Sequence, residues 1–307
     1  MIMYVTGNLF ESPAQVLVNT VNTVGVMGKG VAYEFKRLFP EMFAQYRDLC
    51  ESGQFGIGQL WIYRTPNKWV LNFPTKKHWR NPSKVEYITA GLDTLVRHYS
   101  EMGVHSIAFP PLGCGHGQLD FETQVRPEME RHLRNLPIEV FIYPSRDDSF
   151  VPEHQDLKGM KEWLRSEPTS LPFTEVWEDL VQIVERQNGF RTLTKGSPFS
   201  VRINRDPDEL VVAAAGGNTY RIPYDTLLAF WQQLRTHGFS MRHIAPGINR
   251  QMSYLIPVLS ELPYVRPVRV ADRYDRLIKN PVVGLQVLPS AFRRPKERPQ
   301  LPLFELA

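Results

Sequence analysis

The chain has 307 residues, of which 42% are hydrophobic and 22% are charged, with a formal net charge of +4 and two cysteines. This length and composition exclude a disordered or fibrous chain and are typical of a protein that buries two hydrophobic cores. Two cysteines exclude a disulfide framework, and no apolar run has the length of a membrane span, so we expect a protein of the reducing cytoplasm without a membrane partner.

Short apolar strands alternate with amphipathic helices in the first half of the sequence. Apolar residues at helical spacing mark helices near residues 31–39, 88–96 and 125–133. This alternation predicts an α/β domain over residues 1–150, with a mixed, largely parallel sheet flanked by helices. Its strands are expected at residues 3–5, 16–19, 60–63, 69–73, 107–110 and 139–143.

A glycine-spaced loop follows the second expected strand. Gly25, Gly28 and Gly30 let the backbone approach a ligand closely, and a helix that opens near residue 31 directs unpaired N–H groups into the loop. A diphosphate fits such a loop, although an ordinary strand-to-helix turn gives the same local pattern. Residues 5–8 and 108–117 also follow expected strands, at the edge where open α/β sheets bind ligands, and they favour the binding site.

With these three segments in this order and spacing, residues 1–145 resemble the macrodomain family, which binds ADP-ribose. The segments from Val18 to Gly30 and from Asn72 to Arg80 are similar to those of the DarG antitoxins, which remove the ADP-ribose that DarT toxins attach to thymidine in single-stranded DNA. The resemblance implies a DNA ADP-ribosyl glycohydrolase that acts on ADP-ribosylated single-stranded DNA and opposes a DarT-like toxin. Two alternatives stay open: a hydrolase of ADP-ribosylated proteins or small molecules, and a non-catalytic ADP-ribose reader.

The resemblance also implies which residues contact ADP-ribose. Asn8 stands where the family commonly has an aspartate that meets the adenine amine, and Asn22 stands where the family contacts the distal ribose. The alternative for Asn22 is a turn residue that caps its own loop. The diphosphate is expected between the two glycine-containing loops. The expected contacts are Asn8, Leu9, Asn22, Gly25, Met27, Gly28, Lys29, Gly30, Leu112, Gly113, Cys114, Gly115, His116 and Gly117.

Lys76 is the expected catalytic residue. The segment of Thr75, Lys76 and Lys77 resembles that of the terminal ADP-ribose-protein glycohydrolases, in which the first lysine adds to C1″ of the distal ribose. A lysine is a nucleophile only when it is partly deprotonated, which desolvation and the nearby cations Lys77 and Arg80 favour. The alternative is an exposed charge near phosphates. Lys77, Trp79 and Arg80 are candidate DNA contacts, with Trp79 as a face for base stacking.

The sequence does not assign the general acid or base. The protein-directed glycohydrolases carry an acidic residue two positions after their Gly-Cys-Gly, whereas this chain has His116 and Gly117 there, and its nearest carboxylate is Asp120. Asp120 also fits the N-cap of a helix. No His, Cys and Asp cluster has the spacing of metal ligands, and we expect neither a metal nor a cofactor.

Turn formers and charges interrupt the pattern at residues 144–153, and a linker is expected over residues 151–172. Residues 173–285 are expected to form a smaller α+β accessory domain that binds DNA or a protein partner. Its expected elements are a helix from about Thr174, strands at residues 199–203, 210–214 and 219–222, and a helix near residues 227–234.

Residues 239–254 fit two interpretations. One is a DNA-binding helix-turn-helix, in which Asn249, Arg250, Gln251 and Tyr254 open the recognition helix. The other is a helical hairpin that only packs. Residues 191–298 are basic, which indicates a polyanion partner, although scattered arginines also form ordinary solvated surfaces.

Residues 286–307 are expected to form a flexible, basic, proline-rich tail. The last part of the tail, from Gln300 to Phe304, resembles the Gln-Leu-x-Leu-Phe peptide by which bacterial replication and repair proteins dock on the DNA polymerase sliding clamp. The other interpretation is an apolar end that packs on its own domain.

Overall fold

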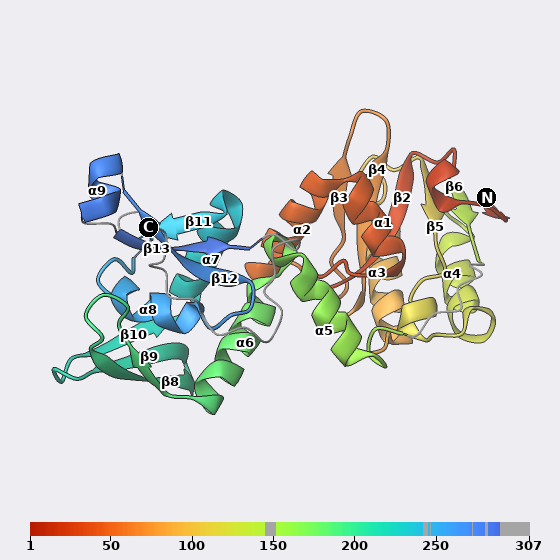
Figure 1. The fold of residues 1–307 in the computed structure, drawn as a ribbon. Coiled ribbons are helices and arrows are strands. Elements are labelled where there is room, and N and C mark those ends of the chain that lie inside the picture. Colours follow the sequence, from red (N-terminus) through yellow and green to blue (C-terminus); the bar gives the residue numbers. More distant parts are fainter. Residues whose placement is uncertain (145–151, 242–244, 246, 272, 280–281, 289–307) are drawn as a thin grey trace. The chain divides into compact units, whose positions relative to one another are not determined.

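The computed structural model describes the chain except for residues 145–151, 242–244, 246, 272, 280–281 and 289–307 (Figure 1). The peptide from Gln300 to Phe304 and most of the expected tail therefore lie outside the described residues. The chain divides into two compact units, Met1–Trp163 and Leu164–Ala307. Within the described ranges, every helix is too short or too polar to cross a lipid bilayer.

The first unit is built on a six-stranded sheet with the order β1-β6-β5-β2-β4-β3. All neighbours are parallel except β3 and β4, which are antiparallel, so the sheet is mixed and largely parallel as predicted. Each predicted strand is present. The strands in sheet order are Ile2–Tyr4, Glu139–Ile142, Ser106–Phe109, Val16–Asn22, Trp69–Lys76 and Trp61–Arg64.

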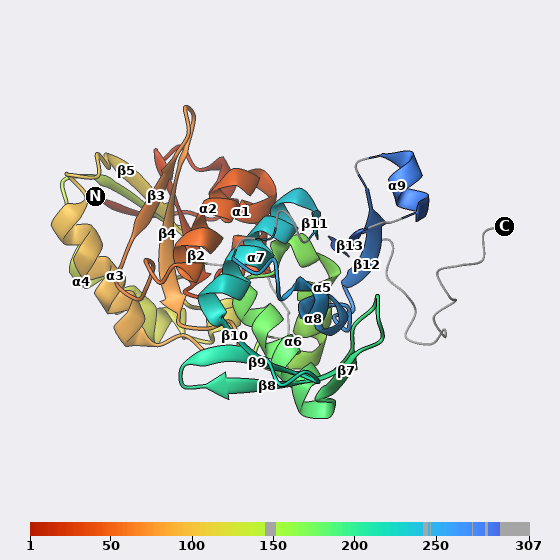
Figure 2. The same cartoon turned by 90° about the vertical axis from the view of Figure 1, so that its left-hand side faces the viewer.

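Helices cover both faces of this sheet (Figure 2). Alternate residues of β2 belong to different cores: Val16 and Val18 pack on the side of α3 and α4, whereas Leu17 and Val21 pack on the side of α1 and α2. Burial on both faces explains why β2 begins with three consecutive apolar residues, Val16 to Val18. The four helices are α1 (Gly30–Leu38), α2 (Pro40–Glu51), α3 (Val85–His98) and α4 (Arg126–Leu133).

The range expected to be a linker, residues 151–172, contains regular structure. Helix α5 covers Leu157–Ser166, and a 3-10 turn follows at Pro168–Ser170. Met160 of α5 is fully buried, and Trp163 lies with its ring centroid 5.5 Å from that of Tyr33 on α1. The segment after β6 thus continues the first unit up to the boundary at Trp163.

The second unit combines helices with a four-stranded antiparallel sheet in the order β10-β9-β8-β7. Leu180 of α6 and Phe230 of α7 belong to the same core as Val201 of β8 and Leu210 of β9. Both helices and the three predicted strands are present. The elements are α6 (Phe173–Arg186), β7 (Gly189–Arg191), β8 (Pro198–Arg205), β9 (Asp208–Ala214), β10 (Thr219–Pro223) and α7 (Tyr224–His237).

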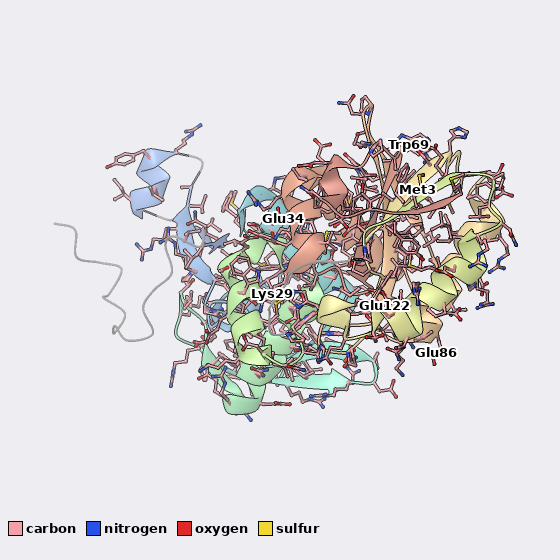
Figure 3. The ribbon with its side chains drawn as sticks, turned by 90° about the vertical axis from the view of Figure 1, so that its right-hand side faces the viewer. Met3, Lys29, Glu34, Trp69, Glu86 and Glu122 are labelled. Atoms are coloured by element: carbon pink, nitrogen blue, oxygen red, sulfur yellow. The ribbon has the colours of Figure 1, made fainter. Side chains whose placement is uncertain are left out.

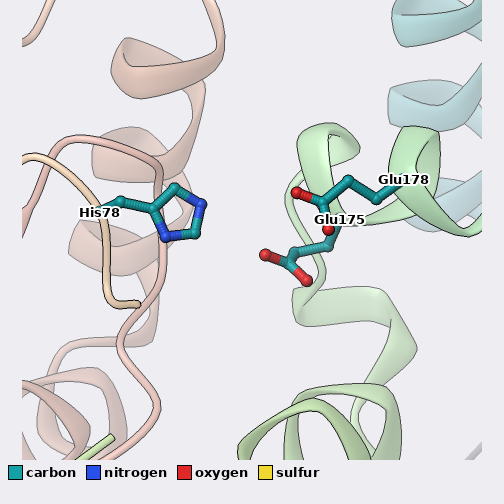
Figure 4. Close-up of side chains that lie close together, drawn as sticks. All are labelled: His78, Glu175 and Glu178. Carbon is teal, nitrogen blue, oxygen red and sulfur yellow. The ribbon is translucent and has the colours of Figure 1, made fainter. Parts of the chain in front are cut away.

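A partly buried ion pair lies at the start of the second unit. The guanidinium of Arg165 donates to Asp179 on α6 at 2.6 and 2.8 Å, and the hydroxyl of Tyr264 donates to the same carboxylate at 2.8 Å. Glu175, which Figure 4 shows on α6 with Glu178 three residues further along, lies 3.6 Å from Arg165. Because these side chains have little access to water, removing one member would leave the other charges poorly compensated.

The helix-turn-helix prediction is wrong. The segment begins with a strand, β11 (Phe239–Met241), in a three-stranded sheet with β13 (Val282–Val287) and β12 (Val265–Val270). Gly238, with φ 72°, ends α7 in the left-handed conformation, and the chain then turns into β11.

Among the described residues of that segment, only those from Met252 onward are helical. Asn249 and Arg250 precede α8 (Met252–Leu259), and Gln251 stands at its N-cap. The Tyr254 ring, expected to read DNA, packs with its centroid 5.1 Å from that of Phe199 and 5.4 Å from that of Tyr220. Another helix of this unit is α9 (Tyr274–Lys279).

Candidate functional site

A cavity opens in the first unit at the C-terminal ends of three neighbouring strands. The ends of β2 and β4 contribute Asn22 and Lys76, and the segment after β5 contributes Pro110 and the loop that follows. This edge is where open α/β sheets bind ligands. The other lining residues are Thr20, Val21, Val26, Gly28, Lys29, Gly30, Val31, Ala32, Thr75, Pro111, Gly113, Cys114, Gly115, His116, Gly117, Pro144 and Glu153.

Asn22 organises the loop between β2 and α1. Its side-chain oxygen accepts hydrogen bonds from the backbone N–H groups of Val24 at 3.1 Å and Val26 at 3.2 Å, and its amide donates to the carbonyl of Val26 at 2.7 Å. The Tyr46 hydroxyl of α2 donates to the Asn22 carbonyl at 2.6 Å. The capping interpretation of Asn22 is therefore confirmed, and its contact with the distal ribose stays a prediction.

The first turn of α1 faces the cavity. Figure 3 labels Lys29 where α1 begins and Glu34 further along the helix. Lys29 is the N-cap, and its side chain forms no capping hydrogen bond with the helix. The first N–H groups of a helix lack partners within the helix and carry its positive partial charge, so this end attracts an anion. The structure brings this helix end and the 113–117 loop to one cavity, as the diphosphate prediction requires.

The second loop forms a 3-10 turn at Gly115–Gly117. The Gly117 carbonyl accepts a hydrogen bond from the Ser83 N–H at 2.9 Å, and a Cβ atom at position 117 would clash with the Ser83 side chain. Only glycine fits this approach between the two segments. The close packing fixes the loop so that its backbone lines the cavity beside Lys76.

Lys76 is the last residue of β4, and its side chain is buried. Its Nζ donates a hydrogen bond to the His116 carbonyl at 2.7 Å and lies 3.4 Å from Oε2 of Glu153. Burial lowers the pKa of Lys76, and the Glu153 carboxylate opposes this shift. Lys77, which we expected to help lower this pKa, is exposed, with its Nζ 6.0 Å from the ring centroid of Tyr87. Desolvation is therefore the main reason why Lys76 is easier to deprotonate.

Glu153 is a site residue that the sequence did not reveal. It belongs to the segment between β6 and α5, 77 residues after Lys76, and it is buried. Burial raises the pKa of Glu153, while Lys76 and Lys29 act to lower it. The next residue, His154, lies with Nε2 2.8 Å from Oε1 of Gln118. The only signal in the sequence is an acidic residue among turn formers.

Asp120 serves as an N-cap. Its carboxylate accepts hydrogen bonds from the backbone N–H of Thr123 at 2.7 Å and from its hydroxyl at 2.6 Å, and these bonds lower the pKa of Asp120. The carboxylate caps the short π-helical turn Phe121–Val125. Asp120 is not among the described residues that line the cavity. Asp120 therefore has a structural role as an N-cap.

Several expected ADP-ribose contacts lie elsewhere in the described part of the chain. Asn8 is exposed and accepts from the Phe10 N–H at 3.1 Å, which caps the 3-10 turn Leu9–Glu11. Gly25 lies against the side chain of Arg47. The other three have buried apolar side chains in the cores of the first unit, and they are Leu9, Met27 and Leu112. Contacts of these five residues with the ligand stay predictions.

Trp79 does not offer the open stacking face that we predicted. Its ring is fully buried, and the Arg80 guanidinium lies 4.5 Å from the ring centroid. The ring centroid of His78 lies 5.6 Å from that of Trp79. Figure 4 shows the His78 side chain. A base cannot stack on a face that a guanidinium already covers, and of the predicted DNA contacts Lys77 is the exposed one.

Comparisons with known proteins agree on the first unit. Residues 18–126 match the family model described as Macro domain. The chain is 49% identical over 148 residues to the DNA ADP-ribosyl glycohydrolase of Thermus aquaticus, covering 47% of this chain and 41% of that protein. It is 37% identical over 158 residues to a DNA ADP-ribosyl transferase-DNA ADP-ribosyl glycohydrolase fusion protein of Thermosipho africanus, covering 45% of this chain and 40% of that protein.

Among solved structures, the macrodomain of Mycobacterium tuberculosis DarG is similar to this chain, with 46% identity and a TM-score of 0.46. That likeness covers 48% of this chain and 99% of the solved one. The chain thus spans well under two thirds of the length of the two curated relatives, and the similarity to them falls on the unit that holds the cavity.

Proposed function

The first unit of this chain is a macrodomain, and on that premise we propose that it removes ADP-ribose from thymidine in single-stranded DNA and so opposes a DarT-like toxin. The observation that carries the proposal is the buried Lys76 at the end of β4, within the cavity that the two glycine-containing loops line. A reader of ADP-ribose would not need a desolvated amine, whereas a nucleophile does.

The cavity supplies the parts that ADP-ribose recognition needs. The diphosphate would bind at the first turn of α1 and along the backbone of the 113–117 loop, where N–H groups and the helix dipole favour an anion. The distal ribose would then lie near Lys76, because β2 and β4 are neighbours and Asn22 pairs with Lys76 in the sheet. This arrangement presents C1″ to the amine.

The reaction would proceed in two steps at C1″ instead of one direct displacement by water. The Lys76 amine adds to C1″ as the bond from C1″ to the base nitrogen breaks and its electron pair stays on the base, which then takes up a proton. Water displaces the lysine in the second step and leaves a hydroxyl group on C1″. A covalent intermediate of this kind avoids a free oxocarbenium ion.

The relatives favour DNA over the alternative substrates. Both curated proteins carry the name DNA ADP-ribosyl glycohydrolase, and one of them is fused to a DNA ADP-ribosyl transferase. A hydrolase of ADP-ribosylated proteins would use the same cavity. The absence of an acidic residue directly after the Gly113 to Gly115 segment weighs against that class, because Asp120 is occupied as an N-cap.

We infer that the second unit is an accessory domain that binds DNA or a protein partner, with the toxin itself among the candidates. The basic character of residues 191–298 supports a polyanion. The peptide from Gln300 to Phe304 adds the sliding clamp as a proposed partner. With these partners, we propose that the protein acts in the cytoplasm.

The test compares substrates in parallel. Wild-type protein is incubated with ADP-ribosylated single-stranded DNA and with ADP-ribosylated protein, and free ADP-ribose and the unmodified products are followed by mass spectrometry. We expect release from DNA. Release from protein alone would make the protein-directed alternative correct, and tight binding of ADP-ribose without release from either substrate would make the chain a reader.

The Lys76→Ala variant tests the nucleophile. It should abolish release while ADP-ribose affinity stays within a few-fold of wild type, because a nucleophile acts on the barrier rather than on ground-state binding. The matched control is Lys158→Ala, which removes an exposed lysine of α5 and should keep turnover. Retained turnover in Lys76→Ala would refute the role of Lys76.

A further inference from the structure

The carboxylate of Glu153 reaches Lys76 from a separate part of the first unit. The segment after β6 brings Oε2 of Glu153 to 3.4 Å from Nζ of Lys76, and the two side chains are 9% and 8% exposed. Among the described residues that line the cavity, Glu153 is the only one with a carboxylate. The pair therefore sits in the cavity wall with little access to water.

Among the described residues around Lys76, one group within hydrogen-bond distance of the amine can take its proton. Its other hydrogen-bond acceptor is the carbonyl of His116, which cannot be protonated in this pH range. The pKa of His154 is lowered, mainly by burial of the imidazole and secondly by the nearby charge of Lys76. Lys29 is the other cation that acts on Glu153. Glu153 is thus the basic group within hydrogen-bond distance of the amine.

Burial favours a neutral pair. Separate buried charges are costly, whereas an amine and a carboxylic acid that share a proton carry no charge into the cavity wall. Consistent with this, burial lowers the pKa of Lys76 and raises the pKa of Glu153. Both shifts act in the direction of proton transfer from nitrogen to oxygen.

We propose, resting on the function proposed above, that Glu153 is the positioning residue of Lys76: it holds the amine in the cavity and accepts one of its protons, so that Lys76 attacks as a neutral nucleophile. This answers the question that the sequence left open about the proton acceptor. Asp120 and His116 are not needed for that role.

The protons balance over one cycle. One proton moves from Nζ to Oε2, and the lone pair of the amine forms the bond to C1″ while the base departs with the electrons of its own bond. The base takes a proton from solvent. Water then gives its hydroxyl to C1″ and its remaining proton to solvent, the bond from C1″ to Nζ breaks with its pair on nitrogen, and Glu153 returns its proton to Lys76. The sum is hydrolysis of one glycosidic bond.

The experiment is the pH dependence of single-turnover release of ADP-ribose from ADP-ribosylated single-stranded DNA. In wild type the proton stays within the pair, so we expect a rate that is flat across neutral pH. In Glu153→Gln the amine must lose its proton to solvent, so the rate should rise about ten-fold for each pH unit until Lys76 is neutral. Glu153→Asp should recover part of the flat region.

Controls separate this role from a structural one. Glu86→Gln changes an exposed glutamate of α3 and should leave the profile unchanged. ADP-ribose affinity and the thermal unfolding temperature of Glu153→Gln report on folding. If Glu153→Gln lost the same fraction of the wild-type rate at every pH, Glu153 would only support the fold. If Glu153→Gln were faster than wild type at low pH, Glu153 would only stabilise the ammonium form of Lys76. Either result overturns the proposal.

The two proposals fail in different ways. Inactive wild-type protein, or an active Lys76→Ala variant, would contradict the proposed function itself. Activity that depends on Lys76 but has the same pH profile in Glu153→Gln as in wild type would overturn only the role of Glu153.

Discussion

The backbone of Gly30 lies so close to the imidazole of His116 that a Cβ atom at position 30 would be 2.9 Å from Cδ2 of the ring. Gly30 begins α1 with φ 60°, and His116 stands in the 3-10 turn of the second loop. The two loops that line the cavity thus meet at this contact. A diphosphate bound at the end of α1 would lie beside it.

Gly30→Ala should weaken ADP-ribose binding. An alanine at this φ costs about 1–2 kcal/mol, and its methyl group would also push His116 away from the first loop. We expect affinity to fall by about ten-fold or more in calorimetry. Gly53→Ala is the matched control, because Gly53 has φ 69° but no atom within 4 Å of an added Cβ.

A second variant separates strain from contact. Gly30→Ala/His116→Ala removes the neighbouring ring, so it should bind better than Gly30→Ala/His116→Gln, whose longer side chain still fills the space. Unchanged affinity in Gly30→Ala would show that the two loops do not hold the ligand together.

Both cysteines should resist alkylation in the folded protein. Burial raises the pKa of Cys50 to about 12, and burial together with Asp120 raises the pKa of Cys114 to about 12. Only the thiolate reacts, and at pH 8 a thiol with this pKa is ionised in about one molecule in ten thousand. Iodoacetamide should label glutathione far faster than the native protein, and both cysteines should be labelled after unfolding. Rapid native labelling at Cys114, read by mass spectrometry, would show that the cavity wall opens.

Local patterns were sufficient for most of the fold. The strands of the first unit and helices α6 and α7 were predicted because their apolar residues recur with the period of the element. Helix α2 was missed, since the break between α1 and α2 is the single residue Phe39, and Pro40 at the first position of α2 reads equally well as a helix breaker. Strand β11 was read as helix because only its pairing with β13 makes it a strand.

The sequence predicted only those site residues that belong to short, contiguous motifs. The position of Lys76 follows from its place at a strand end, and the cavity contains the glycine loops that the sequence indicates. Glu153 depends on the return of the chain 77 residues later, which no spacing rule gives. Trp79 was placed on the surface because it stands among cations, whereas the Arg80 guanidinium covers its ring.

Binding of unmodified single-stranded DNA should weaken steeply as salt rises. Arg202 on β8 and Arg221 on β10 are exposed, and both are sheet partners of Val211, so their side chains flank one position on the sheet surface. Each phosphate contact contributes about 0.7 to the slope of log affinity against log salt. Arg202→Ala/Arg221→Ala should therefore lower the slope by about 1.4 in fluorescence anisotropy titrations. Arg97→Ala on α3 is the control, and a salt-independent interaction would point to a protein partner.

The peptide from Gln300 to Phe304 should bind the DNA polymerase sliding clamp. Leu301, Leu303 and Phe304 provide apolar anchors for a hydrophobic pocket, and Gln300 can fix the orientation through its amide. Recruitment to replication forks would suit an enzyme that clears ADP-ribose from single-stranded DNA.

A pull-down with purified clamp tests this peptide in the full-length protein. Wild type should retain the clamp, and Leu303→Ala/Phe304→Ala should lose it, because truncating two central anchors removes most of the binding energy of a short peptide. Glu305→Ala changes the residue directly after the peptide and should retain binding. If a synthetic peptide with the wild-type sequence shows no binding at high micromolar concentration, the resemblance is a coincidence of five residues, and the chain end has another role.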